Sequence, residues 1–133
     1  MTASAICLTH LQWRDKLLDG VLNGRVPEIQ LDGTQCALGK WIESPESSQA
    51  PTALVAPLRA IHADLHRRAG TILQSMRDGI DTSSLLARVH EEITPALNET
   101  WERLKALIDA QHAAAHAGTG ASAAGWHTHP VAT

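Results

Sequence analysis

Apolar residues recur every three or four positions in four stretches of the chain, a spacing that gives an α-helix one buried face. Turn-forming residues separate these stretches, namely Asn23-Gly24, Pro45 and Asp78-Gly79. The predicted helices cover roughly residues 4–22, 34–44, 52–77 and 84–113. We therefore expect an all-α fold, an antiparallel four-helix bundle in which the second helix is short and begins near Thr34 or Cys36.

Two prolines fall inside the predicted long helices, where a missing N–H group and a bulky ring disturb helical hydrogen bonding. Pro57 lies near the start of the third helix, so we expect its regular part to begin nearer Pro57 than Thr52. Pro95 lies well inside the fourth helix, where a kink is expected. The segment from Asp81 to Ser84 offers caps for the start of that helix.

The composition is aliphatic, with 44% apolar residues, four Trp and no Phe or Tyr, so Leu, Ile, Val and Trp must fill the core. A chain of 133 residues can bury one such core. The last residues are mostly Ala, Gly, Ser, Thr and His, which form no apolar face. The expected organisation is one helical domain over residues 1–113 and a flexible tail over 114–133.

The formal net charge is −3 and Lys and Arg form no block, so nucleic acid is not an expected partner. No apolar run is long enough to span a bilayer, which argues against membrane insertion. The N-terminus lacks the basic start and apolar stretch of a signal peptide, so a cytoplasmic location is expected. In that reducing compartment Cys7 and Cys36 are expected to be metal-binding or reactive rather than disulfide-bonded.

Two histidines, His62 and His66, occupy positions i and i+4 of the third predicted helix, close enough on one face to share an ion. Such a pair alone is more often exposed or hydrogen-bonded than metal-bound. Apolar residues such as Leu58 and Leu65 surround it, so at least one imidazole should face inward and needs a partner for each ring nitrogen. A metal ion is one solution, provided that further ligands exist.

Cys36 and His10 are candidate further ligands. Cys36 lies at the start of the short helix, where backbone N–H groups and the helix dipole favour a thiolate, and Gly39 would allow another helix to approach closely. His10 lies in the apolar stripe of the first helix, three residues before Trp13. The alternatives are a small buried cysteine and a core histidine bonded to a carbonyl. Taken together, three His and one Cys form a set preferred by tetrahedral zinc.

The sequence resembles the chemoreceptor zinc-binding domain family in three elements: His-Leu-Gln-Trp at 10–13, Cys-Ala-Leu-Gly-Lys-Trp at 36–41 and His-Ala-Asp-Leu-His at 62–66. The resemblance covers roughly residues 4–110. It implies a helical bundle, commonly a homodimer, that binds Zn²⁺ through His10, Cys36, His62 and His66.

Members of this family usually regulate a linked chemoreceptor signalling domain or a diguanylate cyclase, which makes cyclic-di-GMP. The implied signal is zinc occupancy, or oxidation of the zinc-bound thiolate by hypochlorous acid, so Cys36 is the implied redox-reactive residue. No output module is recognisable in this sequence, and the expected partner is therefore a chemotaxis or cyclic-di-GMP signalling protein in trans.

Two functions other than a zinc-dependent sensor are also compatible with these residues. One is a purely structural zinc module that docks a partner. The other is a metalloenzyme, but no general base lies near the zinc motif. Cys7 could lie near the metal or resolve an oxidised Cys36, although a small helix-face residue is the simpler interpretation. A second metal site is conceivable among the C-terminal histidines, which are His112, His116, His127 and His129.

Overall fold

The protein is described here by a computed structural model, in which residues 3–44 and 50–118 are placed. Its helices are α1 (Ala3–Asn23), α2 (Ala37–Ile42), α3 (Thr52–Arg77), α4 (Thr82–Arg88) and α5 (Thr94–Gly118), with a π-helical turn, η2 (Val89–Ile93), between the last two. These described residues form no strand, so the predicted all-α fold is confirmed. Within the same residues, no helix is both long enough and apolar enough to cross a membrane.

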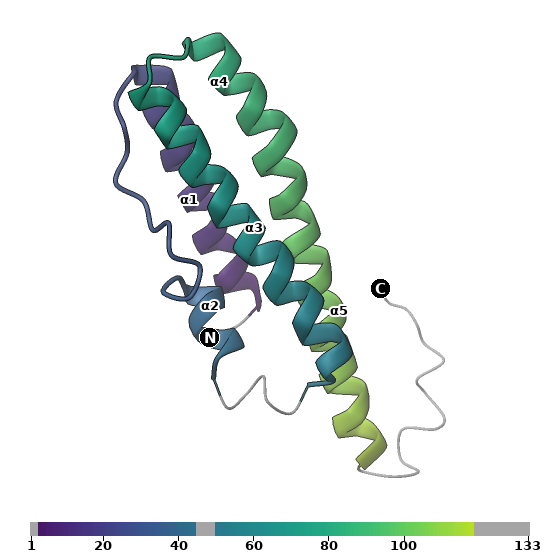
Figure 1. Ribbon diagram of the computed structural model, residues 1–133. Helices are drawn as coiled ribbons and strands as arrows, with labels where there is room; N and C mark the ends of the chain where they lie inside the picture. Colours follow the sequence, from purple (N-terminus) through teal and green to yellow (C-terminus); the bar gives the residue numbers. More distant parts are fainter. Residues whose placement is uncertain (1–2, 45–49, 119–133) are drawn as a thin grey trace.

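Three long helical elements lie side by side: α1, α3 and the continuous rod formed by α4, η2 and α5 (Figure 1). The chain between α1 and α2 runs back along the bundle, so α1 and α3 point the same way and the rod points the opposite way (Figure 1). Ring contacts agree with this direction, because His10 faces His62 and Trp13 faces His66. Helix α2 packs at the end where α1 begins.

The predicted ends of α1 and α3 and the predicted cap of α4 are confirmed. Pro45, another predicted stop, lies outside the described residues. Gly24 and Gly79 follow α1 and α3 with φ angles of 67° and 83°, a left-handed conformation that residues with a Cβ rarely adopt. At the start of α4, the Asp81 carboxylate accepts a hydrogen bond from the Ser84 backbone N–H at 3.0 Å. These turns reverse the chain and return α4 onto the bundle.

The two prolines are accommodated in different ways. Helix α3 begins at Thr52 with Pro57 inside it, so the prediction of a regular start nearer Pro57 is wrong. The helix tolerates Pro57 because the missing N–H costs one hydrogen bond near its N-terminus. Before Pro95, where a kink was expected, the helix widens into the π turn η2, which adjusts the hydrogen-bond ladder ahead of the proline.

Helix α5 continues to Gly118, past the predicted end at residue 113, because the alanines in this stretch are strong helix formers. His112 is exposed on this helix. The side chain of His116, together with His127 and His129, lies outside the described residues, as does the predicted tail from residue 119 on.

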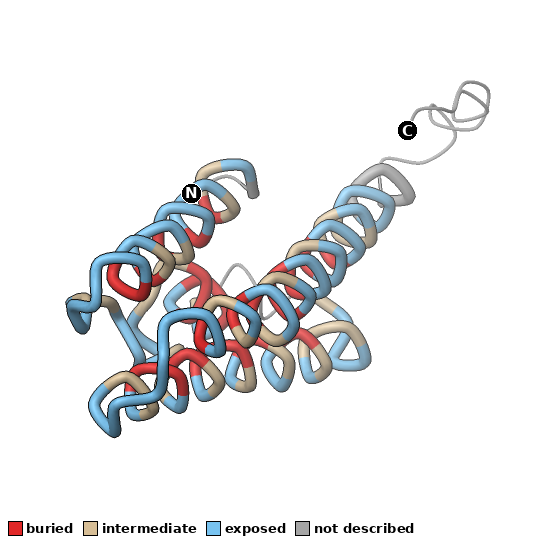
Figure 2. Tube along the Cα trace, turned by 90° about the horizontal axis from the view of Figure 1, so that it is seen from above, coloured by how far each residue is buried: buried red, intermediate tan, exposed pale blue. Residues whose placement is uncertain are grey.

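Buried residues lie on the facing sides of the helices (Figure 2) and form two hydrophobic clusters. One cluster joins the first parts of α1 and α3 to α2 and the middle of α5, and contains Ile6, Trp41 and Leu58. The other joins the rest of α1 and α3 to α4 and η2, and contains Trp13 and Leu65. His10 lies between Ile6 and Trp13 along α1, so buried polar side chains are inserted where the two clusters meet.

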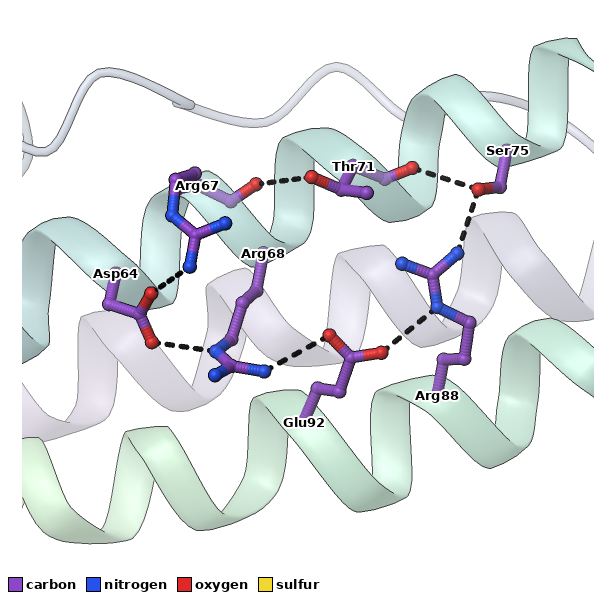
Figure 3. A network of polar contacts seen from close by, with 7 residues as sticks. All are labelled: Asp64, Arg67, Arg68, Thr71, Ser75, Arg88 and Glu92. Carbon is purple, nitrogen blue, oxygen red and sulfur yellow. Dashed lines mark hydrogen bonds and ion pairs between the residues drawn. The ribbon is translucent and has the colours of Figure 1, made fainter.

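Helix α3 is also tied to the rod by charged side chains (Figure 3). Arg68 bonds to Asp64 on its own helix at 2.6 Å and to Glu92 of the π turn at 3.2 Å. Glu92 in turn accepts from Arg88 at 3.0 Å, and Arg88 donates to Ser75 of α3 at 2.7 Å. The network spans the outer surface of the contact between α3 and the π turn.

Candidate metal centre

Four side chains converge from three separate segments of the chain. His10 comes from α1, Cys36 immediately precedes α2, and the other two, His62 and His66, come from one face of α3. One ligand atom from each of them lies within 4.8 Å of the others. No other group of three or more His, Cys, Asp or Glu side chains in residues 3–44 and 50–118 is close enough to share an ion.

Three of the four donor atoms are spaced close to what a tetrahedral zinc ion requires. With zinc bonds of about 2.0–2.1 Å to nitrogen and about 2.3 Å to sulfur, the edges of the tetrahedron are about 3.4 Å between nitrogens and about 3.6 Å from sulfur to nitrogen. The Nε2 atoms of His10 and His62 are 3.2 Å apart. Cys36 Sγ lies 3.6 Å from the first of these and 3.1 Å from the second. Three donors therefore already stand near the corners of one site.

Backbone carbonyls orient two of the imidazoles. His10 Nδ1 lies 3.0 Å from the Ile6 carbonyl oxygen, and His66 Nδ1 lies 3.0 Å from that of Gln30. With Nδ1–H donating, each ring directs the lone pair of Nε2 into the site. For these two rings the orienting acceptor is therefore a backbone carbonyl.

His66 supplies a buried polar atom that a metal would satisfy. Its Nε2 has no hydrogen-bond partner, although the residue is only 2% exposed. Leaving such an atom unpaired is costly, and a cation beside its lone pair removes that cost. The residues present therefore fit a zinc ion.

Burial keeps the three imidazoles neutral, which is the form that binds metal. It lowers the pKa of His62 to about 3 and that of His66 to about 4, with smaller contributions from the neighbouring histidines. Burial also lowers the pKa of His10, and this effect is larger than that of the hydrogen bond to Ile6, which raises the pKa. These imidazoles therefore remain unprotonated at neutral pH.

Cys36 acts as the N-cap of α2, and its sulfur accepts a hydrogen bond from the Gly39 N–H at 3.4 Å. The prediction that this position favours a thiolate is wrong for the metal-free site. Burial raises the pKa of the Cys36 thiol and outweighs the backbone N–H groups of Gly39 and Leu38, which lower it. A bound metal is then needed to remove the thiol proton.

The segment before Cys36 packs against the histidines through glycine. A Cβ on Gly33 would lie 3.4 Å from the ring of His66 and 3.6 Å from that of His62. Gly39 does permit a close approach, as predicted, but its neighbour is the Gly33 backbone rather than another helix. The connection between α1 and α2 thus covers the α3 histidines.

Other singled-out residues are placed as follows. Trp13 borders the site, with its ring 4.9 Å from that of His66, and its Nε1–H donates to the Gln30 carbonyl at 2.8 Å. Cys7 is half-buried and is not part of the four-residue cluster. Asp64 is half-buried and pairs with Arg68 and Arg67.

Sequence reasoning missed Gln30, because the atom that orients both Trp13 and His66 is its backbone carbonyl, which any residue type would supply.

Two hollows open beside the four residues. One, of about 610 Å³, is lined by His10 and Cys36 together with Trp13, Lys16 and Glu28. The other, of about 320 Å³, is lined by His62 and His66 together with Asp32, Arg59 and Arg67. The centre therefore lies between two openings rather than deep in a sealed core.

Comparison with known proteins agrees with this geometry. Residues 10–73 match the family model of the chemoreceptor zinc-binding domain, and this match spans all four convergent side chains. No curated protein and no solved structure matches the chain. Zinc is the cofactor of this kind of domain, and His10, Cys36, His62 and His66 are positioned to bind a metal ion. Over residues 10–73, the chain is therefore similar to the chemoreceptor zinc-binding domain family.

Proposed function

We propose that this domain is a zinc-dependent sensor in which His10, Cys36, His62 and His66 bind one Zn²⁺ and regulate a signalling partner. One observation carries the proposal: donor atoms from three separate segments lie within 4.8 Å of one another. An ion held there joins α1, the start of α2 and α3 at a single point. Its presence or loss changes how these segments are held together, because metal binding and folding are coupled.

We infer a regulatory site rather than a catalytic one. Four protein donors fill the tetrahedral coordination of zinc, whereas catalytic zinc sites keep a position open for water or substrate. The chain's own residues supply what a binding site needs: buried neutral imidazoles, two carbonyls that orient them, and a thiol that becomes a thiolate when it binds.

Oxidation of Cys36 is the second proposed input. Cys36 is half-buried and lines the hollow of about 610 Å³, through which a small oxidant can reach its sulfur. Hypochlorous acid would convert the thiolate to sulfenic acid and release chloride, so that sulfur gains OH and loses two electrons. A sulfenic acid is a poorer zinc ligand than a thiolate, so zinc is released.

The output is proposed to pass to a chemoreceptor-type or diguanylate-cyclase-type protein in trans in the cytoplasm, as the family resemblance implies. A homodimer is part of the proposal. It is supported by exposed leucines along α1, among them Leu8 at 55% and Leu22 at 61% exposure. Exposed apolar side chains that form a contiguous patch mark a surface that contacts another protein.

The test is zinc content in the full chain before and after treatment with hypochlorous acid. We expect one zinc per chain, lost on oxidation, and a Cys36→Ala variant that binds zinc at least a hundredfold more weakly while keeping its helix content. Cys7→Ala is the matched control, since it removes the other thiol and should leave both properties unchanged. Tight stoichiometric zinc in Cys36→Ala would show that the ligand assignment is wrong.

The same measurement separates the sensor from a purely structural zinc module. A structural module would keep its zinc in the presence of oxidant and chelator, and its binding to a partner would not change on zinc removal. Release of zinc at low oxidant concentration, with a change in oligomeric state or partner binding, supports the sensor.

A further inference from the structure

The hollow of about 320 Å³ leads from solvent to His62 and His66, and Asp32 lines it. Asp32 is exposed, whereas the two histidines are buried at 3% and 2% exposure. A carboxylate oxygen is a recognised zinc ligand. This hollow therefore places a potential ligand of the right chemistry between solvent and the buried centre.

The segment that carries Asp32 is fixed against the histidines on both sides. Before it, the Gln30 carbonyl accepts from Trp13 and from His66. After it, Gly33 packs on the imidazole rings of α3 at the distances given above. Asp32 is thus held beside His66, and its charge acts to raise the pKa of His66 against the larger, opposite effect of burial.

Only one of the two carboxylate oxygens of Asp32 accepts the hydrogen bonds from the neighbouring Thr34. Its Oδ1 accepts from the Thr34 N–H at 2.9 Å and from the Thr34 hydroxyl at 2.7 Å, and Oδ2 takes part in neither bond. Within the described chain Asp32 forms no ion pair with Lys or Arg. The two arginines of the hollow, Arg59 and Arg67, are paired with other carboxylates.

The four donors are not equivalent. Those of His10, Cys36 and His62 already lie 3.1–3.6 Å apart, whereas His66 Nε2 has no partner and belongs to the hollow that Asp32 lines. His66 is therefore the donor whose binding completes the coordination of the ion and whose release opens it. It lies on the same side of the site as Asp32.

Building on the zinc site of the proposed function, we propose that Asp32 is an exchange ligand for zinc. Its carboxylate holds the cation at the inner end of the hollow while His66 joins or leaves the other three donors. A group that binds only during passage lowers the barrier in both directions, so it speeds association and dissociation equally and leaves affinity unchanged.

The test uses Asp32→Asn in the full chain, with Zn²⁺ alone as the probe. The asparagine side-chain oxygen can still accept from Thr34, so the local turn is kept while the charge and the strong zinc ligand are lost. Dissociation is measured by stopped flow into a chromogenic chelator, at concentrations where the rate no longer depends on chelator. Association is measured by letting the protein compete with the chelator for Zn²⁺. We expect both rates to fall about tenfold, or about 1.4 kcal/mol in each barrier, with an unchanged Kd.

Glu28→Gln is the matched control, because it removes the same charge from the same connection but lines the other hollow. If zinc exchange slowed equally in Glu28→Gln, the effect would come from the overall charge near the site rather than from Asp32 as a ligand, and the proposal would be overturned. Unchanged rates in Asp32→Asn would overturn it too, as would a weaker Kd caused by faster dissociation alone.

Failure of the zinc assignment is recognised separately, in the unsubstituted chain loaded with cobalt. A tetrahedral site with one thiolate gives a sulfur-to-cobalt charge-transfer absorption, which disappears in Cys36→Ala. If that absorption is present and Asp32→Asn exchanges zinc at the normal rate, only the role of Asp32 is wrong. If it is absent, the ligand set itself is wrong.

Discussion

Gly39 lies directly against the backbone of Gly33: a Cβ atom at position 39 would stand 1.8 Å from the Gly33 carbonyl oxygen. No side-chain rotation relieves an overlap with backbone, so Gly39→Ala must push the connection away from α2. Because the same connection carries Cys36 and covers the α3 histidines, we expect zinc affinity to fall by roughly tenfold or more and thermal stability to fall with it. Isothermal titration with zinc and thermal unfolding measure the two effects.

Gly70→Ala is the control for this substitution. A Cβ at position 70 of α3 meets no atom within 4 Å, and alanine is the better helix former by about 1 kcal/mol. We expect normal zinc affinity and equal or higher stability. A Gly39→Ala variant that behaves like Gly70→Ala would show that the contact with Gly33 is not needed to form the site.

Trp13→Phe is expected to weaken zinc binding without unfolding the domain. The phenyl ring keeps most of the contact with His66 but loses the hydrogen bond from Nε1 to the Gln30 carbonyl. That carbonyl also orients His66, so its displacement misdirects Nε2. We expect a loss of about 1 kcal/mol in the free energy of unfolding and a several-fold weaker zinc affinity. Trp101→Phe, on α5 and outside the four-residue cluster, should leave affinity unchanged. Equal weakening in both variants would contradict the role of Gln30.

The sequence was sufficient to predict the helices and the convergent residues because both depend on spacing. Apolar positions at three and four residues define the buried faces, and the i, i+4 relation alone places His62 and His66 together. Residue type and position made His10 and Cys36 candidate ligands, and the family motif supported joining them to this pair, since no local rule brings three separate segments together.

What could not be predicted depends on tertiary geometry. The Gln30 carbonyl is a backbone atom without a side-chain signature, and the raised pKa of the Cys36 thiol follows from burial that sequence does not specify. The position of Asp32 beside His66 depends on how the connection folds back over α3. The π turn before Pro95 is one of several ways in which a helix can accommodate a proline, and the sequence does not determine which of them occurs.

Glu92→Gln should destabilise the contact between α3 and the π turn while leaving zinc affinity unchanged. Glu92 joins Arg68 to Arg88, but all three side chains are roughly one-third exposed, so solvent weakens each ion pair. We expect a loss of about 1 kcal/mol in the free energy of unfolding at low salt, and less at high salt, because counterions screen the pairs. Urea unfolding at the two salt concentrations measures this. Glu99→Gln, which breaks an exposed pair with Arg103 within α5, should have a smaller effect.

The metal-free domain should lose stability as the pH falls below the usual histidine range. In the folded chain the pKa of His62 is about 3 and that of His66 about 4, against 6.5 for a histidine in the unfolded chain. Between these values the unfolded chain binds more protons than the folded one, so acid favours unfolding. The free energy of unfolding is therefore highest above about pH 6.5 and decreases by a few kcal/mol as the pH approaches about 4.

Urea unfolding of the chelator-treated protein over this range measures how steeply the free energy of unfolding depends on pH. His66→Asn removes one of the responsible groups and should make the slope shallower. A stability that stays flat or rises on acidification would show that these imidazoles are not buried and neutral.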